Sequence, residues 1–302
     1  MPNATPGGSA RPVGVRPVGV IGLGRMGAAM ARRLAERHEV LGYDVRDVTD
    51  VPVTLVPAPA ALMEHCSVVL AALPSPNETR AVVLEPACRE AFLAGDAVLV
   101  DTSTSDPGSW RALAAELGDA RARMLDAPVL GRPDRCGAWT MPVGGEAAAL
   151  DAARPVLELL ANRVERVGDL GSGHTLKLLN NMMFAAINVV TAEAVAACDV
   201  LGIEADRFVD MVGTSSAATV SPLFQDLAPR MVGRGGETVF TVGLLAKDLQ
   251  LAARMCEDAG AQLVSARASQ IVVSQAMRMG LFDRDSSALV DWYRRRDAHG
   301  GA

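Results

Sequence analysis

The sequence predicts an α/β domain with a doubly wound, mostly parallel sheet, followed by a long interdomain helix and an all-α domain. In the first half, short apolar runs alternate with helical segments, which is typical of a parallel sheet. After about residue 171 the pattern is helical throughout and no strand alternation returns. The 302 residues are enough for two hydrophobic cores. We therefore expect a disordered leader at 1–16, the α/β domain at 17–171 and the all-α domain at 172–302.

The α/β pattern begins with the apolar run 18–21 and the glycine-rich turn that follows it. Further strands are expected at 40–44, 67–73, 97–100 and 123–125, and helices at 28–37, 81–93 and 107–117. Ligands of such sheets bind beyond the carboxyl ends of the strands. The polar turns at these ends are therefore the candidate site.

The second half opens with a long helix that starts near 171–177 and reaches about Gly202. It is apolar on nearly all sides, which predicts a buried helix. Only 15 residues separate Lys177 from Glu193, and they include three asparagines, so we expect no membrane span. Shorter helices are expected at 205–212, 222–231, 242–259 and 262–279.

The composition limits which binding partners and which cellular compartment we expect for this protein. The net charge is −6 and the longest basic run is 294–296, so nucleic acid is not an expected partner. The five cysteines include no CxxC pair, which argues against a disulfide framework or a metal site and favours the reducing cytoplasm. The glycine-, proline- and arginine-rich residues 1–17 lack the apolar core of a signal peptide.

The first motif is the GxGxxG turn at residues 22–27, placed between a strand and a helix. Gly22 would allow the tight turn, Gly24 the close approach of a pyrophosphate, and Gly27 close packing of helix on strand. The helix N-terminus would offer N–H groups to the phosphates. The loop predicts a Rossmann-type dinucleotide site that includes Leu23, Arg25 and Met26; the alternative is a plain βα turn.

Asp44 lies 22 residues after Gly22, at the expected end of the second strand. An acidic residue at this spacing accepts hydrogen bonds from the adenosine ribose and would repel the extra phosphate of NADP. Arg46 argues the other way, because it could pair with that phosphate. The balance favours NAD over NADP, and the alternative for Asp44 is a solvated strand-end residue.

Lysine usage singles out two positions. Of 29 cationic residues, 27 are arginine and only Lys177 and Lys247 are lysine. Lysine can lose its proton in a suitable site, whereas arginine cannot. Gly173, Lys177 and Asn181 are spaced four apart and share one helix face, where the glycine would leave room for a ligand. The alternative is a lysine whose head reaches solvent at the start of the helix.

These motifs give the chain a resemblance to the β-hydroxyacid dehydrogenases, which include 3-hydroxyisobutyrate dehydrogenase. The resemblance covers about 18–290 and rests on blocks at 22–27, 101–104, 126–129, 173–181 and 247–248. It implies that Lys177 is the catalytic acid/base and that Asn181 positions lysine and substrate. It also implies cofactor contacts at Leu73, Pro74, Thr104 and Lys247, and a homodimer or homotetramer.

One block departs from the family pattern. The family usually continues Asp-x-Pro-Val with Ser-Gly-Gly, a loop that holds the substrate carboxylate, whereas this chain has Leu130, Gly131, Arg132 and Pro133. Arg132 could supply a bidentate carboxylate clamp, or Leu130 could line a less polar pocket. A third alternative is that Arg132 points to solvent. The substrate is therefore a β-hydroxyacid or a related small carbonyl or alcohol, with no single compound implied.

Two other functions remain as alternatives. An imine reductase-like enzyme has a similar fold but generally lacks a lysine at position 177. A non-catalytic dinucleotide-binding module would resemble the dehydrogenase-like domains of some chromatin readers. The lysine and the lack of a basic tail argue against that module.

Overall fold

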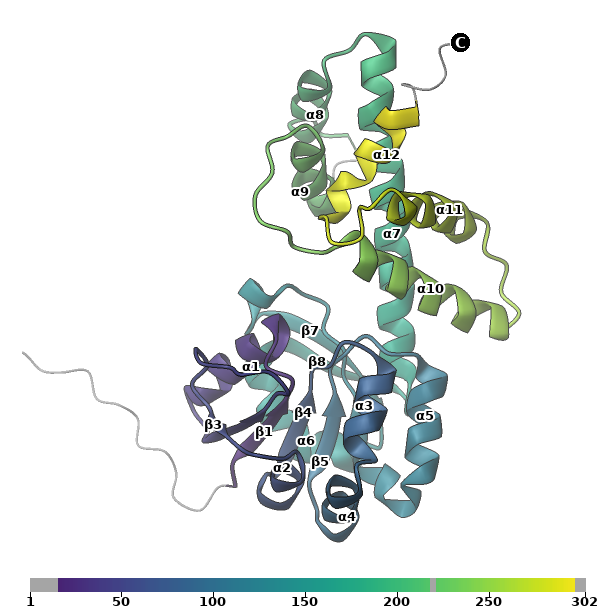
Figure 1. Cartoon of the computed structure of the whole chain (residues 1–302). Helices are drawn as coiled ribbons and strands as arrows, with labels where there is room; N and C mark the ends of the chain where they lie inside the picture. Colours follow the sequence, from purple (N-terminus) through teal and green to yellow (C-terminus); the bar gives the residue numbers. More distant parts are fainter. Residues whose placement is uncertain (1–15, 218–220, 297–302) are drawn as a thin grey trace, which may run out of the picture. The chain divides into compact units, whose positions relative to one another are not determined.

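The computed structural model describes residues 16–217 and 221–296 and divides into two compact units, Met1–Lys177 and Leu178–Ala302 (Figure 1). The predicted leader lies outside the described residues except for Arg16. The Arg16 guanidinium donates to the carbonyls of Cys66 (2.8 Å) and Glu64 (3.2 Å) and pairs with Asp96. Arg16 therefore belongs to the first unit, not to a leader.

The first unit is built on one sheet of eight strands in the order β3-β2-β1-β4-β5-β6-β7-β8. All neighbours are parallel except β6 and β7. From β1 the strands are added in one direction up to β3 and in the other direction from β4 onward, which confirms the doubly wound α/β fold. The strands are β1 (Val18–Ile21), β2 (Val40–Tyr43), β3 (Thr54–Leu55), β4 (Val68–Ala71), β5 (Val98–Asp101), β6 (Met124–Asp126), β7 (Trp139–Gly145) and β8 (Ala161–Gly168).

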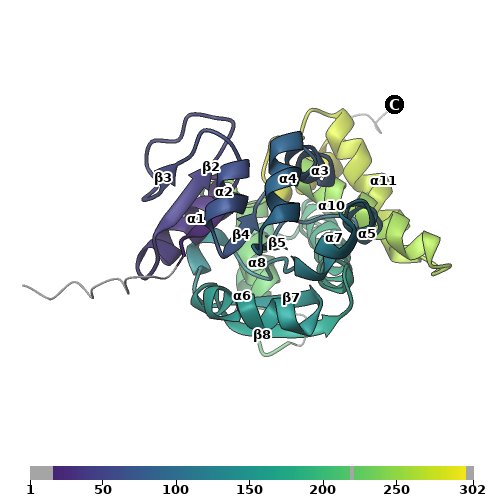
Figure 2. The same cartoon turned by 90° about the horizontal axis from the view of Figure 1, so that it is seen from below.

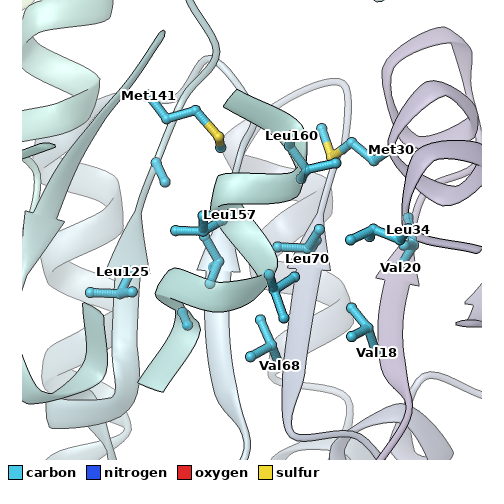
Figure 3. Close-up of a cluster of buried hydrophobic side chains, with 14 of the residues drawn as sticks. Val18, Val20, Met30, Leu34, Val68, Leu70, Leu125, Met141, Leu157 and Leu160 are labelled. Atoms are coloured by element: carbon cyan, nitrogen blue, oxygen red, sulfur yellow. The ribbon is translucent and has the colours of Figure 1, made fainter. Parts of the chain in front are cut away.

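Helices cover both faces of this sheet, as Figure 2 shows. Alternate strand residues point to opposite faces, so Val18 and Val20 pack with α1 and α6 (Figure 3). Ile21 packs with helices of the other face. The helices of the first face are α1 (Arg25–Ala35) and α6 (Ala147–Leu160). Those of the other face are α2 (Ala60–His65), α3 (Pro76–Val83), α4 (Pro86–Ala94) and α5 (Pro107–Glu116).

The structure corrects the predicted elements in two ways. The single helix expected at 81–93 is wrong, because α3 ends at Val83 and Pro86 starts α4, where the Glu85 carboxylate accepts the Cys88 N–H (2.8 Å). The prediction also overlooks β3, α2, α6, β7 and β8. The run of β7 contains Pro142 and two glycines, which obscure a strand in a sequence.

The second unit is helical, and its described residues contain no strand. The long helix α7 (Ser172–Leu201) continues from the first unit and contributes Ala185, Val189 and Ala192 to the core. Leu227, Leu245 and Val273 from other helices pack in the same core. The remaining helices are α8 (Ala205–Gly213), α9 (Pro222–Met231), α10 (Val242–Asp258), α11 (Val264–Arg278) and α12 (Leu289–Arg296), of which α12 was not predicted.

Helix α7 is also the one described helix that is long and apolar enough to cross a membrane by length and composition. Of its most apolar 18-residue stretch, 44% is buried inside the structure. Buried core helices pass the same test, so this feature is weak evidence by itself.

Candidate active site

The glycine turn after β1 is fixed by backbone packing. Gly22 has φ +86°, and a Cβ there would lie 2.5 Å from the Ala72 carbonyl oxygen. A Cβ on Gly27 would lie 1.8 Å from the Gly22 carbonyl oxygen. Both glycines are therefore required, the first by the left-handed turn and the second by the close approach of α1 to that turn.

Gly24 differs from Gly22 and Gly27 because a Cβ at this position would meet no backbone atom. A Cβ there would meet only the Arg46 Nη2, at 3.6 Å. Gly24 is the N-cap of α1 and provides no side-chain hydrogen bond to the first turn. An open backbone at an uncapped helix N-terminus is the environment that binds phosphate.

The Asp44 carboxylate lies beside this turn and is held by several donors. Its Oδ2 accepts the Leu23 N–H at 2.7 Å, and its Oδ1 accepts the Arg46 N–H at 2.9 Å. The Arg46 side chain donates to both carboxylate oxygens, at 3.0 and 3.1 Å. Hydrogen bonding from Arg46 lowers the pKa of Asp44 to about 2, although partial burial opposes the shift. Asp44 and Arg46 thus form one bidentate pair.

A pocket of about 540 Å³ lies beside Arg46 and the glycine turn. Its lining includes Gly24, Arg25 and Arg46. Pro133 also lines it, since the short 3₁₀ helix η2 (Pro133–Arg135) packs against α1. The loop expected to contact the substrate therefore also borders the pocket predicted for the dinucleotide, which the sequence did not indicate.

The carboxyl ends of β4 and β5 are joined by side-chain hydrogen bonds. The Ser103 hydroxyl accepts the Leu73 N–H at 2.9 Å, and the Thr102 hydroxyl donates to the Ala71 carbonyl at 2.7 Å. Leu73, which makes the first of these bonds, and Thr104, which follows Ser103 in the chain, are both predicted cofactor contacts. Both residues are partly exposed. Pro74, which is exposed, precedes α3.

The start of α7 is anchored on the ends of β5 and β6. The Asp126 carboxylate accepts the N–H groups of Gly171 (2.6 Å) and His174 (2.9 Å). The buried His174 ring places Nε2 3.3 Å from Asp101 Oδ2. Burial raises the pKa of Asp101, but the neighbouring His174 and Ser103 outweigh it, so the pKa is lowered. Burial raises the pKa of Asp126.

A glycine is required at position 173 for a different physical reason from the one predicted. A Cβ there would lie 2.6 Å from the carbonyl oxygens of both Asp126 and Pro142. The space on that side is filled by strand backbone, not left open for a ligand. Lys177 follows one turn later on α7, partly exposed, and is the only lysine of the first unit.

The loop after β6 is tied to β7. Leu130 exchanges backbone hydrogen bonds with Thr140, at 2.9 and 3.3 Å. A Cβ on Gly131 would lie 2.2 Å from the Trp139 ring, and the Trp139 Nε1 donates to the Arg132 carbonyl at 2.7 Å. The Arg132 backbone is therefore fixed while the residue itself is exposed.

In the second unit the other predicted residues form one polar chain. Asn181 Nδ2 donates to Asp248 Oδ2 at 2.6 Å, and Asn180 Nδ2 donates to Asn181 Oδ1 at 3.1 Å. Asp248 Oδ1 lies 3.3 Å from Lys247 Nζ. The buried Asp248 thus joins Asn181 to Lys247. The signal in the sequence for Asp248 is its place directly after Lys247, one of only two lysines.

Comparison with known proteins assigns the chain to a protein family. A family model described as the NAD binding domain of 6-phosphogluconate dehydrogenase matches residues 17–168. A second, described as NAD-binding of NADP-dependent 3-hydroxyisobutyrate dehydrogenase, matches residues 171–293. A probable mitochondrial 3-hydroxyisobutyrate dehydrogenase of Arabidopsis thaliana is 31% identical, over 80% of this chain and 77% of the relative. The chain belongs to the β-hydroxyacid dehydrogenase family.

Other relatives agree with this placement. The 3-sulfolactaldehyde reductase of Escherichia coli is 29% identical, over 92% of this chain and 95% of its own. The structure of Mycobacterium tuberculosis 3-hydroxyisobutyrate dehydrogenase with L-serine has a TM-score of 0.79 at 24% identity and covers 93% of this chain and 99% of that one. A Streptomyces aurantiacus imine reductase shares the fold at a TM-score of 0.60 and 22% identity, covering 91% and 99% of the two chains.

As a β-hydroxyacid dehydrogenase, the chain is an oxidoreductase that acts on hydroxyl groups with NAD or NADP. The residues of the glycine turn fit this cofactor. The open side of Gly24 and the uncapped N-terminus of α1 would hold the pyrophosphate, and Arg46, which is paired with Asp44, lines the same pocket.

Proposed function

We propose that this enzyme transfers a hydride between the nicotinamide and a β-hydroxyacid, or the corresponding aldehyde or ketone, with Lys177 as the general acid/base. The observation that carries the proposal is the placement of Lys177. It is the only lysine of the first unit, on a helix whose first turn is anchored to the ends of β5 and β6.

A bound nicotinamide would supply or accept the hydride. When the alcohol is oxidised, Lys177 Nζ would take the hydroxyl proton; in reduction it would return it. Asn181 lies four residues further along α7, on the same helix face, and would help to orient the lysine and the substrate. Hydrogen bonds with Asn180 and Asp248 already hold the Asn181 amide. We propose Lys247 as a further cofactor contact.

We further propose a soluble cytoplasmic enzyme that forms a homodimer or homotetramer and binds neither nucleic acid nor membrane. All five cysteines are free, which suits a reducing compartment. Exposed apolar side chains at the end of α7 and on α8, namely Val200, Leu201 and Met211, support self-association.

The function is tested by a panel of short 3-hydroxyacids with NAD and NADP, the matching aldehydes with the reduced cofactors, and cyclic imines. We expect turnover of hydroxyacids and aldehydes. Reduction of imines without any oxidation of hydroxyacids would instead establish the imine reductase alternative.

The same panel tests Arg132 as the carboxylate clamp. Because a charge-assisted bidentate contact contributes about 1.5–3 kcal/mol, Arg132→Ala should raise the KM for a carboxylate substrate by at least about tenfold. The exposed Arg135 of the same loop provides the matched control, since Arg135→Ala should leave KM unchanged. An unaltered KM in Arg132→Ala would favour a guanidinium that points to solvent.

Cofactor choice is proposed to depend on the Asp44–Arg46 pair, with the carboxylate favouring NAD. Removing the carboxylate in Asp44→Ala should weaken NAD binding by about tenfold, the value of one charge-assisted hydrogen bond, and NADP binding less. Arg46→Ala should weaken NADP and leave NAD bound. Fluorescence titration of NADH and NADPH measures both, and equal changes for the two cofactors would remove the pair from the adenosine site.

The depressed pKa of Asp44 also sets the expected pH dependence of NAD binding. A carboxyl whose pKa is lowered to about 2 stays ionised at every pH well above that value. The Kd for NAD should therefore stay constant on mild acidification of the wild-type enzyme. In Arg46→Ala the pKa of Asp44 should return toward 3.8, so the loss of NAD affinity on acidification should begin at higher pH.

A further inference from the structure

The strongest unassigned feature is a buried polar cluster beneath the start of α7. Asp101, Asp126 and His174 are each completely buried, and all three belong to the first unit. Asp101 and Asp126 face each other as partners in the register of β5 and β6. Full burial of three titratable side chains is costly unless they bond to one another or to backbone.

The two carboxylates contact the start of α7 in different ways. Asp126 binds backbone, through the N–H groups of Gly171 and His174. Asp101 accepts the Ser103 N–H (2.9 Å) and the Ser105 hydroxyl (3.1 Å), and its Oδ2 lies 3.3 Å from His174 Nε2. His174 is thus a side chain of α7 that contacts the Asp101 carboxylate.

The His174 ring is held from a second direction. The Trp110 ring of α5 packs edge to face against it, with centroids 6.1 Å apart at 81°. The turn before the helix is equally tight, because Gly171 has φ +93° and its Cβ would lie 3.2 Å from Pro107. Helix α7 therefore cannot rotate or slide at its start without breaking the contacts of His174.

Lys177 is three residues after His174, which is less than one helical turn. Its Cα position is set by the same backbone that Asp126, Asp101 and Gly173 fix. A rotation of the first turn would displace the lysine head by more than it displaces the backbone, because the ammonium stands at the end of a four-carbon stem.

From this geometry we propose that Asp101 and His174 are positioning residues: the buried pair fixes the first turn of α7 and so places the Lys177 ammonium for proton exchange. The catalytic part of this statement rests on the proposed function of Lys177. The positional part does not, because the anchoring is a property of the protein alone.

The chain offers a direct probe of the positional part. Reductive methylation with ¹³C-formaldehyde labels only Lys177, Lys247 and the N-terminal amine, because the sequence holds two lysines. Lys177→Arg and Lys247→Arg assign the two lysine signals. The spectrum reports on the environment of Lys177 without substrate or cofactor.

His174→Leu should move the Lys177 methyl resonance at one fixed pH and leave that of Lys247 in place. His174→Gln, whose amide can donate to Asp101, should restore it. In unlabelled enzyme, His174→Leu should lower kcat by about 10–100-fold, as expected for a small misplacement of a reacting group, with the Kd for reduced cofactor unchanged. His174→Gln should recover most of the kcat.

Asn188→Leu is the matched control. Asn188 is a buried polar residue of the same helix, in the core of the second unit, and neither amide atom is hydrogen bonded in the structure. This change should move neither lysine signal. If His174→Leu does not fold, Asp101→Asn provides the same comparison, since an amide keeps an acceptor for Ser103 but loses the charge that faces His174.

An unmoved Lys177 signal in a folded His174→Leu or Asp101→Asn variant overturns the positioning role, and so does an equal shift in Asn188→Leu. Failure of the proposed function looks different. In that case Lys177→Ala keeps its turnover, while His174→Leu still moves the Lys177 signal.

Discussion

Replacing Lys177 by alanine is expected to abolish most turnover while the enzyme still binds its cofactor. General acid–base catalysis contributes about 10²–10⁴-fold to the rate, and kcat should fall by that factor. The glycine turn and the Asp44–Arg46 pair lie at other strand ends and are untouched by the change. The Kd for NADH or NADPH, measured by fluorescence, should therefore stay near the wild-type value.

Two control variants distinguish the loss of proton transfer from the loss of a positive charge. Lys177→Arg keeps a cation but cannot release its proton at usable pH, so it should be nearly as inactive as Lys177→Ala. Lys247→Ala removes the other lysine, whose proposed role is cofactor contact, and should raise the KM for cofactor more than it lowers kcat. Undiminished turnover in Lys177→Ala would contradict the mechanism.

The sequence predicted those features that depend on neighbours along the chain. The glycine turn, the β1 strand and the α9 helix are local patterns, and their bounds were close to those found. The two lysines stood out by composition alone. Their roles stay predictions, but their positions on α7 and α10 were correctly anticipated as helical.

The features that the sequence did not predict depend on distant partners. The Asn181–Asp248 hydrogen bond joins residues 67 apart, and the Asp126–His174 bond joins residues 48 apart. Nothing local to Gly173 reveals that Asp126 and Pro142 fill the space beside it. The strands β7 and β8 likewise become visible only through their pairing.

The second large effect is expected from two glycines of the same turn, which fail in different ways. In Gly27→Ala the new Cβ would sit 1.8 Å from a backbone oxygen, so α1 must move away from the turn. Overpacking of this kind costs roughly 3 kcal/mol. Thermal unfolding should show a Tm lower by roughly 6–12 °C, and cofactor affinity should be lost together with stability.

Gly24→Ala should separate these two losses. Its Cβ meets only the flexible end of Arg46, at 3.6 Å, and the backbone there is extended and tolerates alanine. Stability should change by no more than about 0.5 kcal/mol. The methyl group would nevertheless stand where the pyrophosphate approaches the backbone. Cofactor affinity should fall by about 100-fold, equivalent to about 2.7 kcal/mol.

Gly213→Ala provides the matched control, because among the described residues no atom lies within 4 Å of its added Cβ. It should lower neither Tm nor affinity, since alanine is a better helix former than glycine. Calorimetry and cofactor titration on the three variants then distinguish a binding glycine from a folding glycine. If Gly24→Ala bound the cofactor normally, the phosphate would not approach the N-terminus of α1. The turn would then be only a tight link between strand and helix, the alternative that the sequence left open.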